Sequence, residues 1–132
     1  MTRAVVADSG PLFAIADATD EHHQRALKEF ELLAQDRREV LVPYPILLET
    51  YTLTLFRLGR RGASEWLLQI LPAAFISPTP QDYRRAASQV LALSDQSITL
   101  VDATVAAVAG RLGLQVWTYD HHFDVMRVAV WR

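Results

Sequence analysis

Short apolar runs alternate with longer segments of helical periodicity, and this alternation restricts the possible folds more than any other feature of the sequence. Five such runs, at residues 4–7, 40–42, 74–76, 116–118 and 128–130, are predicted to be strands. Helical segments lie between them, and strand–helix–strand connections of this kind join parallel strands. The sequence therefore predicts an α/β fold with a mostly parallel sheet of about five strands.

The segments between these runs carry the start and stop signals of helices. Asp8 or Ser9 can cap one helix, and Thr99 can cap another that Gly113 ends. A basic turn at residues 59–62 is predicted to join two helices into a hairpin. The remaining helices are predicted over residues 22–35, 43–58, 63–71, 81–93 and 121–126.

The length of the chain and its lack of cysteine limit the kinds of protein it can be. Its 132 residues, 51% of them apolar, suit one compact domain over residues 1–132. The absence of cysteine excludes disulfides, thiolate zinc sites and cysteine nucleophiles. Nothing at the amino terminus is typical of a secretory signal, and the apolar stretches fall short of the roughly 20 residues that span a bilayer. We therefore expect a cytoplasmic protein that does not enter a membrane.

The net charge of −2 at first argues against a polyanionic partner. The balance changes if four carboxylates are metal ligands, because thirteen basic side chains then face eleven acidic ones. All the basic residues except Lys28 are arginines, whose planar guanidinium group suits phosphate oxygens. A nucleic-acid substrate is therefore compatible with the composition.

Four acidic residues stand out by their positions, namely Asp8, Glu49, Asp102 and Asp120. Asp8 and Asp120 follow predicted strands, at the sheet edge where open α/β folds bind ligands. Asp102 is the only ionisable residue between positions 100 and 110. Glu49 lies on an apolar helix stripe, where an unpaired carboxylate is costly. Two strand-end acids and two acids near helix starts are expected to converge on one rim of the sheet.

Each position also has a purely structural explanation. Asp8 can be a helix N-cap, Asp102 can belong to a capping box with Thr99, and Asp120 can be an ordinary turn residue. Glu49 can extend its carboxylate to water or pair with an arginine. We favour a shared site because four unrelated explanations would otherwise have to coincide on the same rim.

A cluster of acids needs a proton or a cation, since carboxylates about 4 Å apart repel by roughly 4 kcal/mol at an effective dielectric constant near 20. Oxygen ligands without cysteine favour Mg²⁺ or Mn²⁺. Such a cation can lower the pKa of a bound water and neutralise charge on a phosphodiester. The residues therefore suit phosphoryl transfer or hydrolysis.

The segments around the four acids resemble the motifs of the PIN-domain family, and in particular its VapC-type toxins. The matching segments are residues 6–12 (Val-Ala-Asp-Ser-Gly-Pro-Leu), 48–49 (Leu-Glu), 100–103 (Leu-Val-Asp-Ala) and 118–123 (Thr-Tyr-Asp-His-His-Phe). The match covers essentially the whole chain. It implies a three-layer α/β/α domain and an Mg²⁺- or Mn²⁺-dependent endoribonuclease that leaves 5′-phosphate and 3′-hydroxyl ends.

The resemblance also implies roles for individual residues. Asp8, Asp102 and Asp120 are expected to bind the metal, and Glu49 to bind it or to orient a water. Ser9 is expected to contact phosphate or a metal-bound water. A toxin of this kind is further implied to form a homodimer and to be held inactive by a cognate antitoxin protein.

Asp124 and the histidines complicate the last of these motifs. Asp124 is a fifth acid, four residues after Asp120, and we favour Asp120 because it comes directly after the strand. The histidine pairs at residues 22–23 and 121–122 lack the spacing of a zinc site, and neighbours on a helix point about 100° apart. Zinc is therefore disfavoured, while His121 or His122 could still touch RNA.

Arg57, Arg60 and Arg61 form a basic cluster at the predicted turn. They could contact RNA phosphates or an acidic segment of the antitoxin. They could equally form a solvated turn that keeps the protein soluble.

Two other functions fit part of the pattern. Response-regulator receivers and haloacid-dehalogenase-like phosphatases also carry acids at strand ends, but they use a late lysine that this chain lacks. A non-cleaving PIN-like module would bind RNA or a protein, yet all four acids are present here. A metal-dependent ribonuclease is the favoured prediction, and its RNA target is left open.

Overall fold

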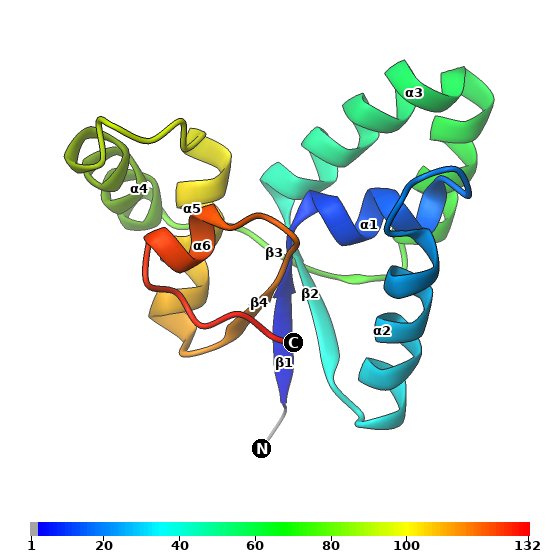
Figure 1. Ribbon diagram of the computed structural model, residues 1–132, viewed down its shortest axis with the longest axis horizontal. Coiled ribbons are helices and arrows are strands. Elements are labelled where there is room, and N and C mark those ends of the chain that lie inside the picture. The colour runs from blue at the N-terminus through cyan, green and yellow to red at the C-terminus, as the bar shows by residue number, and fades with distance from the viewer. Residues whose placement is uncertain (1–2) are drawn as a thin grey trace.

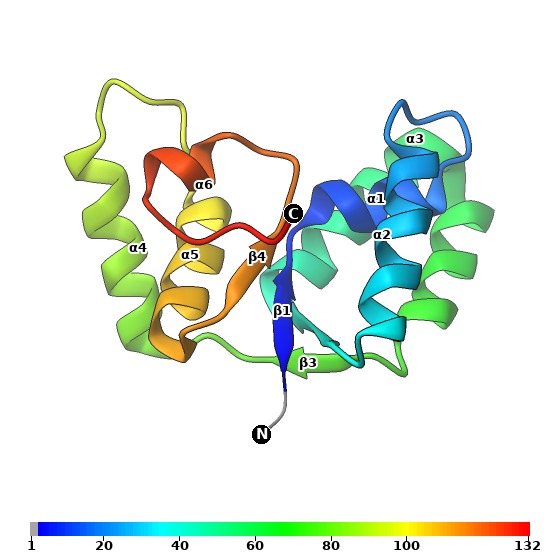
Figure 2. The same ribbon diagram turned by 60° about the horizontal axis from the view of Figure 1, so that its bottom comes forward.

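The computed structural model describes residues 3–132, which form one α/β unit (Figures 1 and 2). The elements are β1 (Ala4–Ala7), α1 (Ser9–Ala16), α2 (His23–Gln35), β2 (Glu39–Pro43), α3 (Tyr44–Ile70), β3 (Ala74–Ile76), α4 (Pro80–Ala92), α5 (Leu100–Leu112), β4 (Gln115–Trp117) and α6 (His122–Val125). None of these helices is long and apolar enough to cross a membrane.

The sheet is parallel throughout, and its strand order is β3-β2-β1-β4. Val5 of β1 pairs with Val40 of β2 on one side and with Gln115 of β4 on the other. Helices α1, α2 and α3 cover one face, and α4, α5 and α6 cover the other, which gives the predicted three layers (Figure 1). All four residues of β1 are buried, because the strand lies in the middle of the sheet and is covered on both faces.

The sheet has four strands rather than about five. Residues 128–130, predicted as a strand, contribute only a parallel bridge between Val130 and Val116. Val116 donates its N–H to Ala129 and accepts one from Trp131, so the pairing is confined to the backbone of a single residue of β4. Three alternating residues do not distinguish a strand from extended chain that touches the sheet once, and this is why the prediction was wrong.

The turn predicted at residues 59–62 is confined to Gly59. Its φ of 78° and ψ of 179° break the helical backbone of α3, and the helix resumes directly afterwards. Figure 1 shows α3 changing direction sharply along its length. Only glycine adopts this backbone conformation without strain, which explains why the break falls on this residue. Arg60 and Arg61 therefore lie in the second half of α3 and not in a loop.

Helix α5 is confirmed with both of its predicted ends. The Thr99 side chain caps its start, and Gly113 ends it in the left-handed conformation with φ 68°. The helix is buried nearly all round, as the shortage of charged residues in its sequence indicates. It packs Val105 and Val108 into the core and directs its first turn, which contains Asp102, towards the carboxyl ends of the strands.

Candidate active site

A pocket at the carboxyl edge of the sheet brings together the four acids singled out in the sequence. It has a volume of about 350 Å³ and is lined by Asp8, Ser9, Gly10, Glu49, Thr99, Asp102, Tyr119 and Asp120. Asp8 lies between β1 and α1, and Glu49 on the second turn of α3. Asp102 lies on the first turn of α5, and Asp120 between β4 and α6. Residues from both ends of the sequence meet here because β1 and β4 are neighbouring parallel strands.

Asp8 occupies the N-cap position of α1, but its side chain makes no capping hydrogen bond. Its Oδ2 accepts a hydrogen bond of 2.7 Å from the hydroxyl of Thr118, whereas its buried Oδ1 has no partner among the described residues. Burial raises the pKa of Asp8 to about 7, and the negative charges of Asp102 and Glu49 add to this effect against the opposing Thr118 bond. The capping explanation for Asp8 therefore fails, and its carboxylate is directed into the pocket.

Asp102 forms only half of the capping box that its spacing from Thr99 allows. Its backbone N–H donates to Thr99 Oγ1 at 3.1 Å, but its carboxylate does not return a bond to the backbone of Thr99. In the similar sequence at the start of α4, the Asp82 carboxylate accepts the Thr79 N–H at 2.9 Å and the box is complete. The carboxylate of Asp102 is instead left to the pocket.

Burial raises the pKa of Asp102 as well, and the neighbouring charges of Asp120 and Glu49 raise it further. The starts of α1 and α5 face the same pocket, and the partial positive charge at a helix N-terminus favours nearby anions. The carboxylates therefore repel one another without a lysine or arginine among the described residues that line the pocket.

Glu49 is half-buried and lies between the pocket and an adjacent apolar groove. The groove includes Leu53 and Phe56 of the same helix, while Ile46 is buried in the core. Glu49 makes no ion pair with any described arginine, so that structural explanation fails. Phe56 is 82% exposed, which shows that the apolar stripe of α3 lies open to solvent. The cost of burying a carboxylate therefore does not by itself indicate a function for Glu49.

Asp120 lies three residues after the end of β4, a little further along than the sequence suggested. Its Oδ1 accepts the N–H of His122 at 2.9 Å, and its own N–H donates to Thr118 Oγ1 at 3.0 Å. Asp124 lies outside the acid pocket, and its carboxylate is paired with Arg132 at 3.0 Å. Of these two acids, Asp120 is therefore the one that joins the pocket.

Thr118 is a positioning residue to which the sequence interpretation gave no role. Its single hydroxyl donates to Asp8 and accepts from the backbone of Asp120, so it fixes two of the four acids relative to each other. Its position directly after β4 and two residues before Asp120 was the available signal. Ser9 also lines the pocket, as expected.

The basic cluster does not reach this pocket. Arg57, Arg60 and Arg61 are exposed near the bend of α3, and Arg61 pairs with Glu65 at 3.3 Å. The described residues that line the pocket include no lysine or arginine. The negative charges therefore have no protein cation among them.

The donor set of the pocket fits a hard divalent cation. It offers carboxylate oxygens without sulfur, and the unpartnered Oδ1 of buried Asp8 is a ligand atom in need of a positive charge. Asp102 and Asp120 contribute carboxylates from the same side of the sheet. This arrangement suits binding of Mg²⁺ or Mn²⁺ and, through it, of a phosphate-containing ligand.

Comparison with known proteins gives a family and several structural neighbours. The model of the PIN domain family matches residues 5–129. No curated protein sequence matches the chain.

Among solved structures, VapC20 from Mycobacterium tuberculosis, a sarcin–ricin loop cleaving toxin, is 23% identical with a TM-score of 0.84 over 98% of this chain and 99% of its own. VapBC2 from Rickettsia felis, bound to a DNA fragment from the promoter, is 11% identical with a TM-score of 0.75. The match covers 98% of this chain and 97% of that one. FitAcB from Neisseria gonorrhoeae is 16% identical with a TM-score of 0.72, and the match covers 97% of this chain and 96% of that one. These similarities extend over the whole fold.

Proposed function

Because the chain belongs to the PIN-domain family, we propose that it is a metal-dependent endoribonuclease and the toxin of a toxin–antitoxin pair. The observation that carries this proposal is the convergence of four carboxylates in one pocket, with a buried and unpartnered oxygen on Asp8. VapC20, a sarcin–ricin loop cleaving toxin, shares the fold over nearly its full length, and this supports a nucleic-acid-cleaving toxin.

Asp8, Asp102 and Asp120 are the residues that would hold Mg²⁺ or Mn²⁺ in this proposal. The bound ion supplies a water of lowered pKa and neutralises charge that gathers on the phosphate oxygens. The helix starts at Ser9 and Leu100 present backbone N–H groups on the same side, where they favour an anionic substrate.

Glu49 and Ser9 complete the proposed machinery from opposite elements. Glu49 is half-buried at the rim of the pocket, where its carboxylate can accept a hydrogen bond from a water and orient it towards the scissile phosphate. The hydroxyl of Ser9 can donate to a phosphate oxygen. Thr118 holds the Asp8 carboxylate and the backbone of Asp120 in a fixed relation and is proposed to act only through them.

The alternative phosphate-handling class is disfavoured by the position of Lys28. That lysine lies on α2 and is not among the pocket residues, whereas receivers and phosphatases of that class place a lysine beside their acids. A non-cleaving module is disfavoured because the acid set is intact. A protein with either of these two functions would show no metal-dependent cleavage of RNA.

A cognate antitoxin and a second copy of the chain are the proposed protein partners. Solved neighbours named VapBC2 and FitAcB share the fold, which supports an antitoxin. Leu48 and Phe56 on α3 are largely exposed, as is Leu100 at the start of α5, and these apolar side chains support self-association.

The experiment that tests the function is cleavage of labelled total RNA by the purified protein with Mg²⁺, with Mn²⁺ and with chelator. We expect cleavage that needs metal, that Asp8→Asn abolishes and that Asp95→Asn, an exposed acid outside the pocket, leaves intact. Absence of cleavage by wild-type protein free of antitoxin would favour the binding module. Growth arrest on expression, relieved by Asp8→Asn, would support the toxin role.

A further inference from the structure

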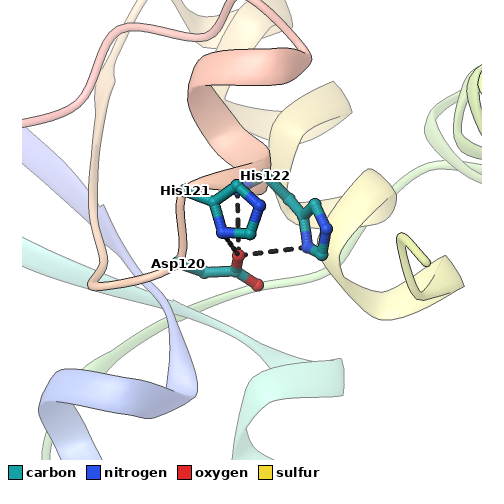
Figure 3. A group of neighbouring side chains, drawn as sticks. All are labelled: Asp120, His121 and His122. Atoms are coloured by element: carbon teal, nitrogen blue, oxygen red, sulfur yellow. Dashed lines mark hydrogen bonds and ion pairs between the residues drawn. The ribbon is translucent and has the colours of Figure 1, made fainter. Parts of the chain in front are cut away.

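We propose that Asp120, His121 and His122 bind a divalent transition-metal ion that prefers imidazole ligands, such as Zn²⁺, beside the acid pocket. Each of the three side chains offers one ligand atom, and these atoms lie within 4.8 Å of one another. Figure 3 shows both imidazole rings gathered around one carboxylate oxygen of Asp120. Two of its three ligand atoms are nitrogens, so its donor set differs from that of the acid pocket, with which it shares Asp120.

The two histidine rings do not diverge as neighbours on a helix would. His121 precedes α6 as its N-cap, and only His122 belongs to the helix. Asp120 Oδ1 accepts the N–H of His122 at 2.9 Å, which folds the turn back on itself. The ring centroids consequently lie 4.3 Å apart with planes 38° from parallel. The prediction that disfavours zinc considered the spacing and directions of the histidines alone, whereas the structure also places both rings beside the Asp120 carboxylate.

The Nδ1 atom of His122 is the strongest sign of a ligand site. It is buried and has no hydrogen-bond partner among the described residues. It lies 3.1 Å from Asp120 Oδ1, but the directions at this contact are not those of a hydrogen bond, and that oxygen already accepts the N–H of His122. The nitrogen is thus left without a hydrogen bond beside a carboxylate oxygen.

The separation of these two atoms fits a shared metal ion. Two ligands held about 2.1 Å from one ion lie about 3.0 Å apart at a right angle and about 3.4 Å apart at the tetrahedral angle. The observed 3.1 Å between His122 Nδ1 and Asp120 Oδ1 falls between these values. An ion can sit off the line that joins the two atoms, where a hydrogen bond cannot.

His121 supplies the third ligand from the solvent side. Its Nδ1 lies 3.8 Å from Asp120 Oδ1, and its side chain is 76% exposed, so a small rotation of the ring brings it into range. Water completes the coordination. Imidazole ligands favour Zn²⁺ and other late first-row ions over Mg²⁺, which prefers oxygen.

Asp120 would connect this site with the acid pocket. One of its oxygens faces the histidines, and the other projects away from both rings (Figure 3). Asp120 also lines the pocket with Asp8 and Asp102. An ion on the histidines therefore engages a carboxylate that the proposed catalytic metal also needs.

The test is isothermal titration of the metal-free protein with Zn²⁺, which does not depend on RNA cleavage and so can fail or succeed separately from the proposed nuclease. The double variant Asp8→Asn/Asp102→Asn, in which the acid pocket has lost two of its carboxylates, is expected to keep binding Zn²⁺, because it retains the three ligands; the histidine variant is compared with it in the same background. His121→Ala/His122→Ala is expected to lose at least tenfold in affinity. His23→Ala, at a half-buried histidine whose ring contacts the Ala14 carbonyl, is the matched control and should bind normally.

A second measurement on the wild type removes any dependence on how the variants fold. Binding of Zn²⁺ should shift the Nδ1 resonance of His122 in imidazole nitrogen spectra, while His22 and His23 stay unchanged. Unaltered His122 resonances at saturating Zn²⁺ would overturn the proposal. So would equal Zn²⁺ binding by the Asp8/Asp102 variant with and without the His121/His122 substitutions, or loss of binding in the Asp8/Asp102 variant alone.

Discussion

At the scale of single residues, the sequence Thr-x-x-Asp occurs at the starts of two helices, α4 and α5, with a structural role in one and a place in the acid pocket in the other. At Thr79 the aspartate completes a capping box, and Arg111 binds the same carboxylate at 2.8 Å. At Thr99 the box is half formed, and the carboxylate of Asp102 opens into the acid pocket. The two segments therefore differ in what binds the aspartate carboxylate. The four-residue pattern alone does not determine that partner.

The pair Asp82→Asn and Asp102→Asn separates stability from catalysis. Asp82→Asn should lower the free energy of unfolding by about 2–4 kcal/mol, because it weakens a cap and leaves Arg111 without its buried partner. The folded fraction should still cleave RNA. Asp102→Asn should not lower the melting temperature, because it removes a carboxylate whose pKa is raised by burial and by its acidic neighbours, and it should lose at least 100-fold in cleavage rate. Urea unfolding and single-turnover assays on both variants check this, and the reverse pattern would refute the assignment of Asp102.

Asp8 makes the stability of the metal-free protein depend on pH. Its pKa is about 7 in the folded state against 3.8 for an aspartate exposed to water, so the folded state holds the proton more tightly. The stabilisation is complete below about pH 4 and is lost as the pH rises through 7, up to a limit of about 4 kcal/mol. Asp8→Asn removes this dependence. It should therefore melt several degrees above wild type at pH 8 in chelator, with a smaller difference at pH 5.

The control for this prediction is Asp95→Asn, an exposed acid whose melting temperature should follow that of wild type at every pH. Parallel melting curves for wild type and Asp8→Asn from pH 5 to pH 8 would contradict a raised pKa at Asp8. Adding Mn²⁺ at pH 8 should stabilise wild type and not Asp8→Asn.

Thr118→Val tests whether one hydroxyl positions two acids. Valine fills the same buried space but removes the bonds to Asp8 and to the backbone of Asp120. Changes of this kind around a metal site weaken affinity or activity by about 10–100-fold. We expect that loss in Mn²⁺ affinity measured by calorimetry, and recovery in Thr118→Ser. Equal affinity in the valine variant would show that Thr118 is only structural.

At the scale of elements, periodicity and capping signals were enough to find all six helices and the four strands of the described chain. They also indicated that Asp8 and Asp120 lie at one edge of the sheet, because neighbouring parallel strands end on the same side. Strand β3, at residues 74–76, was predicted with its observed bounds. The failure was residues 128–130, where the pattern was too short to predict a strand.

The bend in α3 predicts opposite effects for two glycine substitutions. Gly59→Ala should cost about 1–3 kcal/mol, because its positive φ and extended ψ strain any side chain. Gly110→Ala should gain about 0.5–1 kcal/mol, since this exposed position inside α5 has open space for a Cβ. Urea unfolding of both variants measures the difference. If Gly59→Ala leaves the free energy of unfolding unchanged, the two halves of α3 can join without the bend.

At the scale of the whole molecule, the exposed apolar side chains of α3 and α5 predict self-association. Phe56 is the most exposed of them, so Phe56→Glu should leave the fold intact and weaken the dimer. Light scattering is expected to give twice the mass of one chain for wild type and a lower mass for the variant. Tyr83→Glu, an exposed aromatic on α4, is the control and should remain dimeric. A monomeric wild type would remove the dimer from the proposal.

The pairing of Thr118 with Asp8 spans 110 positions of the sequence, and it has a consequence for how the protein is made. A ribosome adds residues in order, so Asp8 waits unpaired while β2, α3 and α5 are still being synthesised. The pocket closes only after residues 118–120 have emerged and β4 has joined the sheet. Any activity that depends on all four acids can therefore arise only late in folding, after β4 has taken its place beside β1.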